Sequence, residues 1–548
     1  MKIILYFNTI RYLKIEQIFY QIYYRLVKYI PAHSQYSLKT RVKKNKFFDV
    51  SRKPASLINQ NTFKFFGKTG SLLDDGWKVN RKDKLWQYNL NYFDDLNAEN
   101  SIHRKEWHEF ILKSWLNENE YEQNSVAWEP YPTSLRSVNW IKWVLLNNTL
   151  TNECLTSLHY HGVYLEKKLE RHILGNHLFS NAKALIFLGI YFQTTNSDRW
   201  LRKGLKIVKK EIKEQILNDG GNFELSPSYH VNFLEDILDI INILKTYNLN
   251  LHFIKRNLIK DLESIAKKMI QWLFTMTWQD GSLPSFNDSA NNISSSLKNI
   301  IEYASRLGIK EYEIKKEKNL SYSHLKESGY LVIYQNNNKI ILDVGEIGPK
   351  YLTAHSHADT LSFEMTFNSQ KVLVNSGTSC YGESSRRHFE RSTKAHNTVE
   401  ISNRNSSEVW AGFRVANRAF PKNLSIKDSS SSIKINCSHD GYNSFIKKCI
   451  HRRSWIIEDN KITIEDNIIG QKVLAIGRLI FHNEIKILKL KENEYNLTLL
   501  DETIIKVNVK KGSSKLIDWK CTDVMGSIKN TFCLEVLLDN NESLIEIA

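Results

Sequence analysis

The spacing of apolar residues changes near residue 320, and this change limits the folds open to the 548-residue chain. From about residue 100 to 315, apolar residues recur every three or four positions, as in HEFILKSWLN (108–117) and LEDILDIINILKTY (234–247). This period predicts amphipathic and buried helices. After residue 320, short β-branched runs alternate with turn residues, as in GYLVIYQNNNKIILDVG (329–345), which predicts antiparallel strands. We therefore expect a helical half followed by a β-sheet half.

Each half has a natural way to pack. Successive helices joined by loops pack as hairpins, and loops that converge at one end of such a stack surround a cleft. Short strands with repeated hairpin turns predict an antiparallel β-sandwich. We expect an α+β multidomain protein, because a chain of this length exceeds one ordinary core. An N-terminal amphipathic helix and extended arm are assigned to residues 1–80, a helical domain to 81–318 and the sandwich to 319–548.

The overall charge favours anionic partners. The chain has 76 Lys and Arg against 59 Asp and Glu, for a formal net charge of +17, and a summed positive field attracts polyanions. Nucleic acid, anionic membrane and acidic polysaccharide all stay open on charge alone. The plainer interpretation is a lysine-rich composition spread over solvated surfaces.

The N-terminal stretch MKIILYFNTIRYLKIEQIFYQIYYRLVKYI is a poor signal peptide, because Asn8 and Arg11 interrupt its apolar run before any small-residue cleavage site. Apolar residues at three- and four-residue spacing predict an amphipathic helix: Ile15, Ile18, Phe19, Ile22 and Leu26. We expect this helix to pack on the protein, with a membrane surface as the alternative. No other apolar run reaches about 18 residues, so no transmembrane helix is expected.

Two histidines stand one residue apart at the entry of a predicted strand, in AHSHADTLSFEMTF (354–367). Strand alternation points His355 and His357 to the same face. With Asn375 and His396 on neighbouring strands, they could hold a zinc-like cation. The alternative is a set of hydrogen-bonded histidines at a domain interface.

The loops of the helical half carry polar groups that packing does not need. Asn176 and His177 lie in GNHLFSN, and Tyr229 lies in ELSPSYH, where Pro227 fixes the chain just before the ring. Taken singly, Asn176 reads as a helix cap and Tyr229 as a half-buried aromatic.

Taken together, GNHLFSNAKAL (175–185), ELSPSYH (224–230), HSHADTLSFE (355–364) with VNSGT, and AHNTV (395–399) resemble, in order and approximate spacing, the signatures of the heparinase II/III-like polysaccharide lyases. The resemblance extends from about residue 80 to 480. It implies an N-terminal incomplete α/α toroid followed by a C-terminal antiparallel β-sandwich. It also implies an enzyme that cleaves acidic polysaccharides containing uronic acid by β-elimination, with no nucleic-acid partner.

The resemblance implies roles for individual residues. Asn176 and His177 would contact the uronate carboxylate, Tyr229 would act as base and acid, and His355 would be the catalytic histidine of the sheet domain. Tyr381 resembles a second tyrosine near the cleft. Substrate contacts, by aromatic stacking or by charge, are expected from a set of cleft residues: Trp128, Tyr131, Arg136, Glu224 and Arg387. The alternative for the aromatic and arginine side chains is a position at the domain interface.

The metal ligands implied by the resemblance are His357, His396 and Asn375. Asn375 stands where the family usually has Asp. The cofactor would be one structural divalent cation, zinc-like. Family resemblance favours the periplasm or the cell exterior, whereas the N-terminus argues for the cytoplasm.

Two other functions stay open. A toroid-type glycoside hydrolase would need two opposed carboxylic acids, for which Glu129, Glu224 and Asp288 are available in loops. The other is a catalytically inactive polysaccharide-binding or assembly protein on the lyase fold. Neither the exact uronate polymer nor endo or exo action follows from the sequence.

Overall fold

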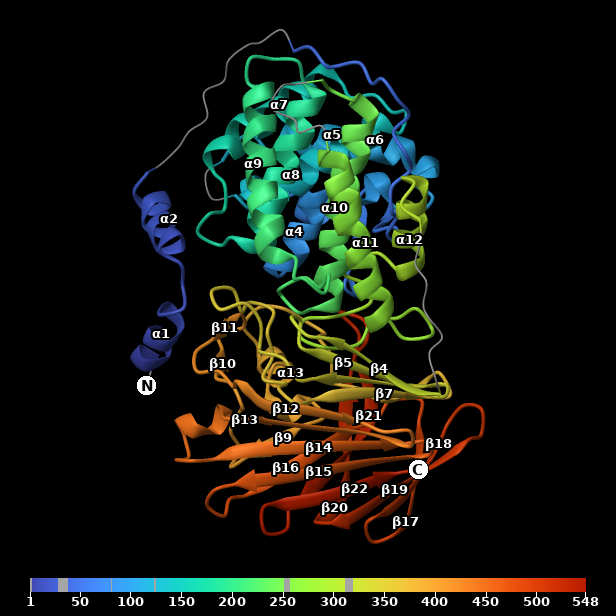
Figure 1. Ribbon diagram of the computed structural model, residues 1–548. Coiled ribbons are helices and arrows are strands. Elements are labelled where there is room, and N and C mark those ends of the chain that lie inside the picture. The colour runs from blue at the N-terminus through green and yellow to red at the C-terminus, as the bar shows by residue number, and fades with distance from the viewer. Residues whose placement is uncertain (1, 28–37, 80, 123–124, 251–256, 311–318) are drawn as a thin grey trace.

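The chain folds into a helical half and a β-sheet half that meet along one junction (Figure 1). The computed structural model describes residues 2–27, 38–79, 81–122, 125–250, 257–310 and 319–548. The predicted order of helices followed by antiparallel sheets is confirmed. Both domain boundaries that we placed adjoin segments outside the described residues.

The helical half is a set of packed helices, in which α8 contacts α6, α9 and α10. Its core is rich in fully buried tryptophans, such as Trp115, Trp140 and Trp200, as expected where apolar residues repeat at helical spacing. The helices of this half are α3 (Leu72–Asp75), α4 (Lys84–Tyr92), α5 (Lys105–Glu118), α6 (Pro130–Leu145), α7 (Asn152–Lys167), α8 (Gly175–Tyr191), α9 (Ser197–Gln215), α10 (Pro227–Tyr247), α11 (Leu258–Met276) and α12 (Leu297–Arg306). A small antiparallel sheet precedes them, made of β1 (Leu57–Asn59), β2 (Thr62–Phe65) and β3 (Lys68–Ser71).

The sheet half contains a five-stranded sheet nearest the helices, in the order β4 (Leu320–Leu325), β5 (Tyr330–Gln335), β6 (Asn338–Asp343), β7 (Phe363–Phe367) and β8 (Gln370–Leu373). An eight-stranded sheet follows, in the order β12 (Pro421–Asp428), β13 (Ser432–His439), β14 (Ile450–Glu458), β15 (Lys461–Ile469), β22 (Glu542–Ile547), β19 (Ile504–Lys511), β18 (Glu494–Thr498) and β17 (Lys486–Lys491). A four-stranded sheet has the order β20 (Ser513–Cys521), β21 (Lys529–Leu537), β16 (Ala475–Ile480) and β9 (Val399–Ile401). The short strands β10 (Val409–Trp410) and β11 (Arg414–Val415) pair with each other, and α13 (Ser385–Glu390) lies in the connection before β9.

The two halves share a small apolar core of their own. Trp272 of α11 and Leu225 of the loop before α10 pack in one buried cluster with Tyr330 of β5 and Ile341 of β6. The hydroxyl of Tyr330 donates to the carbonyl of Leu225 at 2.7 Å. Because this contact fixes the loop before α10 on the five-stranded sheet, side chains from both halves are held close together at the junction.

Two N-terminal helices, α1 (Lys2–Ile10) and α2 (Ile15–Leu26), run along the outside of both halves (Figure 1). We call this segment the strap. The amide of Gln17 donates to the carbonyl of Ile173 in the helical half and of Tyr351 in the sheet half, at 3.2 and 3.4 Å. Trp410 Nε1 donates to the hydroxyl of Thr9 at 3.1 Å. The strap therefore bridges the halves. Among the described residues, no helix is long and apolar enough to cross a bilayer.

Candidate active site

Three of the predicted catalytic residues meet at the junction. The ring of Tyr229, from the first turn of α10, stacks on the imidazole of His355, with ring centroids 3.8 Å apart. The hydroxyls of Tyr229 and Tyr381 are 3.0 Å apart. All three side chains are half-buried, so they are held in place and still open to the solvent side of the junction.

Local hydrogen bonds hold Tyr229 against the sheet half. Pro227 is the first residue of α10, a position where its fixed φ and missing N–H suit a helix start. The hydroxyl of Ser226 donates to the carbonyl of Asp288 at 2.9 Å, and that of Ser228 donates to the carbonyl of Ala290 at 2.9 Å. The N–H of Asp288 in turn donates to the carbonyl of His355 at 3.0 Å. The loop at 288–290 therefore ties the start of α10 to the histidine.

Asn176 and His177 open α8 on the helical side of the site. The turn before them needs glycine, because Gly175 has φ +55° and an added Cβ would lie 2.2 Å from Leu352 Cδ2 of the sheet half. The imidazole of His177 stacks on Tyr131 with centroids 4.3 Å apart, and its Nδ1 is 2.9 Å from Glu170 Oε1. Burial alone would lower the pKa of His177, but Glu170 and other carboxylates raise it above its ordinary value. His177 is therefore biased toward the cation.

Glu224 joins the two sides of the site. Its carboxylate is buried, accepts from the N–H of Asn176 and lies 3.5 Å from His355 Nε2. Burial raises its pKa, against the opposing effect of the two histidines. Glu224 is itself 2% exposed, so its side chain has almost no surface for the substrate contact predicted for it. Tyr131, which is half-buried beside His177, stays a predicted substrate contact.

Asp288 organises the histidines of the sheet half. One carboxylate oxygen lies 3.0 Å from His355 Nδ1 and the other 2.9 Å from His357 Nε2. Arg387 makes a two-pronged ion pair with the same carboxylate, one bond being 2.7 Å. Burial would raise the pKa of Asp288, but Arg387 and both histidines hold it well below its usual range. As an ionised acceptor, Asp288 takes a hydrogen bond from the Nδ1–H of His355, which turns Nε2 toward the site and Glu224.

His357 and His396 approach each other with two unprotonated nitrogens. His396 Nδ1 donates to the carbonyl of Ser392 at 2.8 Å, and His357 Nε2 donates to Asp288. Burial lowers the pKa of His357 to about 4 and that of His396 well below its usual value, so both rings are neutral. His357 Nδ1 and His396 Nε2, 3.1 Å apart, are then two lone pairs without a proton between them, which suits a bound cation.

A second histidine pair in the sandwich gives a useful contrast. His451 Nδ1 lies 3.2 Å from His439 Nε2, and His451 Nε2 lies 2.7 Å from Asp466, which Arg453 also binds. Here the N–H of Gly441 donates to His439 Nδ1, so His439 Nε2 carries the proton that His451 accepts. In this second set, also two histidines, one aspartate and one arginine, a proton lies between the two histidine nitrogens, so no cation is needed there.

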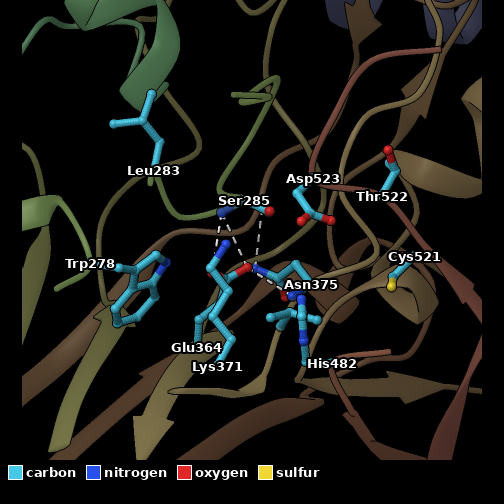
Figure 2. Close-up of a pocket in the computed structure, with 11 residues that line it drawn as sticks. Trp278, Leu283, Ser285, Glu364, Lys371, Asn375, His482, Cys521, Thr522 and Asp523 are labelled. Carbon is cyan, nitrogen blue, oxygen red and sulfur yellow. Dashed lines mark hydrogen bonds between the residues drawn. The ribbon is translucent and has the colours of Figure 1, made fainter. Parts of the chain in front are cut away.

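Asn375, the third predicted metal ligand, uses its side chain elsewhere (Figure 2). Its amide nitrogen donates to the carbonyl of Ser285 at 3.4 Å, and its Oδ1 accepts from the N–H of Asn397 at 3.1 Å. Its backbone N–H donates to Glu364 at 2.8 Å. Across the described part of the chain, no group of three or more His, Cys, Asp or Glu side chains is placed to hold a metal. The donors that fit a cation are the two histidine nitrogens.

Three other predicted substrate contacts need the same correction as Glu224. Arg136 is fully buried, with its guanidinium 4.1 Å above the ring of Trp115. Trp128 is 4% exposed and donates to the carbonyl of Asn119. Arg387 is also fully buried, against Asp288. With no free surface, none of these side chains can stack on or pair with a polysaccharide.

The electrostatics of Tyr229 bear on its predicted role as base. A tyrosine base needs nearby cations that favour the phenolate, and His230 is its neighbour in the sequence. Instead, burial, the Tyr381 hydroxyl and Asp288 raise the pKa of Tyr229 well above its ordinary value. His230 is fully buried, bonded to the carbonyl of Met269, and burial lowers its pKa to about 3. Tyr229 is therefore a phenol in the free site.

The carboxylates that a hydrolase could use are already engaged with other side chains. Asp288 is buried and ionised, and Glu129 is bonded to Tyr88 and to Lys84. Glu224 is buried and lies 3.5 Å from Nε2 of His355, whose Nδ1 contacts Asp288. Sequence reasoning missed the positioning role of Asp288; the polar pair Asn287–Asp288, inside the otherwise small and apolar loop SLPSFNDSA, was the available signal.

Comparison with known proteins then identifies the family. Residues 28–313 match the model described as heparinase II/III N-terminus, and residues 317–523 match heparinase II/III-like, C-terminal. The chain belongs to the heparinase II/III-like family. The motifs that carried the resemblance thus come from both matched regions.

The relatives of this family member agree with the match. It is 27% identical to a heparin-sulfate lyase of Bacteroides stercoris over 386 residues, which is 65% of this chain and 54% of that protein. The chain thus spans about half the length of that relative. A heparin-sulfate lyase of Pedobacter heparinus is 33% identical over 138 residues, 25% of this chain and 20% of that protein. The crystal structure of heparinase III superposes with a TM-score of 0.70 at 17% identity, covering 88% of this chain and 79% of that one. This likeness supports the fold.

Proposed function

We propose that the chain is a polysaccharide lyase that cleaves glycosaminoglycan-like chains at a uronic acid by β-elimination. The observation that carries the proposal is the meeting of Tyr229, His355 and Tyr381 beside Asn176 and His177. Family membership and relatives named heparin-sulfate lyases support it.

The first requirement of the reaction is neutralisation of the uronate carboxylate, because the C5 proton beside an ionised carboxylate is only weakly acidic. The amide of Asn176 and the cation-biased ring of His177 are suitable donors on the helical side. Losing one donor of this kind typically costs about 2.7–4 kcal/mol in the transition state.

The second requirement is a pair of groups that move protons. We propose that His355 Nε2 takes the C5 proton, since Asp288 holds the ring proton on Nδ1. Tyr229, protonated in the free site, then donates to the leaving O4 at hydrogen-bond distance. The alternative is that a Tyr229 phenolate takes the C5 proton and the phenol returns a proton to O4.

In this proposal the role of the cation is structural. His357 and His396 would hold a structural divalent cation, which would fix the segment that carries His355. The reaction needs no group bound to that cation, and its loss would act through the position of His355.

The test of the function is absorbance in the band of the 4,5-unsaturated uronate during incubation with a panel of uronate polysaccharides. We expect a rise with at least one polymer, and none with the Tyr229→Phe variant. New reducing ends without absorbance would instead indicate hydrolysis. Binding without either signal would indicate an inactive scaffold.

A uronate that carries fluoride at C4 separates the two proton routes, because fluoride leaves without protonation. If His355 is the base, Tyr229→Phe eliminates fluoride at close to the wild-type rate while His355→Gln does not. Loss of fluoride elimination in Tyr229→Phe would assign the base to Tyr229.

A further inference from the structure

An amphipathic helix ordinarily buries its apolar face. The strap instead packs on the protein through polar side chains. Gln17, its most buried residue, is polar and 4% exposed. Glu16 pairs with Arg171 at 2.7 Å and Lys210 at 3.2 Å, and Lys14 pairs with Glu214. Burying polar groups that are all paired costs little, so the strap is held by its polar side.

The apolar side of the strap faces solvent. Ile3 is 84% exposed, Phe7 69% and Ile15 85%. Phe19, Ile22 and Leu26 are also more than half exposed. Ile15, Phe19, Ile22 and Leu26 are among the residues whose spacing predicted an amphipathic helix, and they face outward. So many large apolar side chains exposed within one short segment mark a site that another surface covers.

The charges around this face indicate what covers it. Residues 2–27 contain a single acid, Glu16, and its carboxylate is already paired with two cations. Arg11 and Arg25 of the strap are exposed. The neighbouring helix α9, ion-paired to the strap through Lys210 and Glu214, carries an exposed basic row at helical spacing: Arg202, Lys206, Lys209 and Lys213.

We propose that the strap is a docking surface for an anionic lipid bilayer, with α1 and α2 lying in the plane of the headgroups. Apolar side chains on one face with cations at the edge are the combination that binds helices to anionic membranes. A second copy of the chain fits less well. A two-fold contact through the strap would bring two basic α9 rows together, and like charges repel.

Docking in this way would orient the candidate active site. Gln17 is bonded to Ile173, three residues before Asn176, and to Tyr351, four residues before His355. The strap thus borders the loops that supply both sides of the site. A membrane-bound molecule would hold this edge of the site at the lipid surface.

The test is co-sedimentation of the full chain with vesicles of phosphatidylcholine alone or mixed with phosphatidylglycerol. We expect binding to the anionic vesicles that weakens as salt is raised. The strap variant Ile3→Gln/Phe7→Gln/Phe19→Gln/Ile22→Gln keeps good helix formers and should lower the partition coefficient at least tenfold. Lys206→Gln should lower it about fivefold. Leu488→Gln/Ile504→Gln, which changes exposed apolar residues of β17 and β19, is the matched control and should bind like wild type.

Three results would overturn the proposal. One is absence of binding to either vesicle, and another is a strap variant that binds as well as wild type. The third is a dimer, measured by light scattering, that the strap variant converts to a monomer without any vesicle binding, since a second copy would then cover the face. Unchanged circular dichroism and melting temperature of the variants establish that they are folded.

Discussion

Replacing Asp288 with Asn tests whether one carboxylate organises the site. The change removes the charge that pairs with the fully buried Arg387, and breaking one side of a buried ion pair costs about 3–5 kcal/mol. It also lets an amide N–H face His355 Nδ1, which would shift the ring proton to Nε2 and remove the proposed base. In a serine protease triad, the same substitution lowers kcat by roughly 10⁴-fold, and we expect a loss of that order with little change in KM.

The assay is ultraviolet detection of product over a range of substrate concentrations, beside thermal unfolding. Asp288→Asn/Arg387→Gln is the matched control, because it removes both charges of the pair. It should regain much of the lost stability while its kcat stays low, which separates positioning of His355 from stability of the fold. A folded Asp288→Asn protein with kcat within tenfold of wild type would refute the reasoning.

Three further predictions concern substrate charge, Arg136 and acid stability. Arg136 and Arg387 are buried and cannot pair with a sulfate group. The carboxylates of Glu129, Glu170 and Glu224 lie close enough to His177 to raise its pKa, and negative charge near the site disfavours sulfate. An unsulfated uronate polymer should therefore have a higher kcat/KM than its sulfated counterpart; the reverse order would contradict this charge argument. Arg136→Met should leave KM within about twofold of wild type, since Arg136 has no exposed surface; a large rise in KM would show contact with substrate. Burial would raise the pKa of Asp466, but Arg453 and His451 depress it below its ordinary value, so the ionised carboxylate stabilises the fold above about pH 4 and this contribution is lost as pH falls. Asp466→Asn should therefore be less stable than wild type at neutral pH, and chemical denaturation at successive pH values should show the difference narrowing in acid.

The fold was predictable because the signals for it are local. The run at 234–247 lies within α10, and GYLVIYQNNNKIILDVG forms the hairpin of β5 and β6. Repeating apolar residues decide which face of a segment is buried without reference to the rest of the chain. The residues that meet at the junction were found by motif, since Tyr229 and Tyr381 are 152 positions apart.

Contacts between distant segments were not predictable in the same way. Arg387 is buried because it pairs with Asp288, which is 99 positions away in the chain. The sequence around either residue does not indicate that the two form an ion pair. Arg136 was expected to contact substrate through its charge, but its guanidinium is buried against the ring of Trp115. The strap was predicted as a helix, but which side of it is buried depends on ion pairs with Arg171, Lys210 and Glu214. The spacing of apolar residues within 15–26 carries no information about those distant partners.

The division of the site between the two halves has a consequence for folding. Asn176, His177 and Tyr229 belong to the helical half, whereas His355 and Tyr381 belong to the sheet half. Domains generally fold as units before they dock, so each half can acquire its secondary structure while the site is still absent. During refolding from denaturant, recovery of helical circular dichroism will precede recovery of any activity, and the delay between them will report the time at which the halves join.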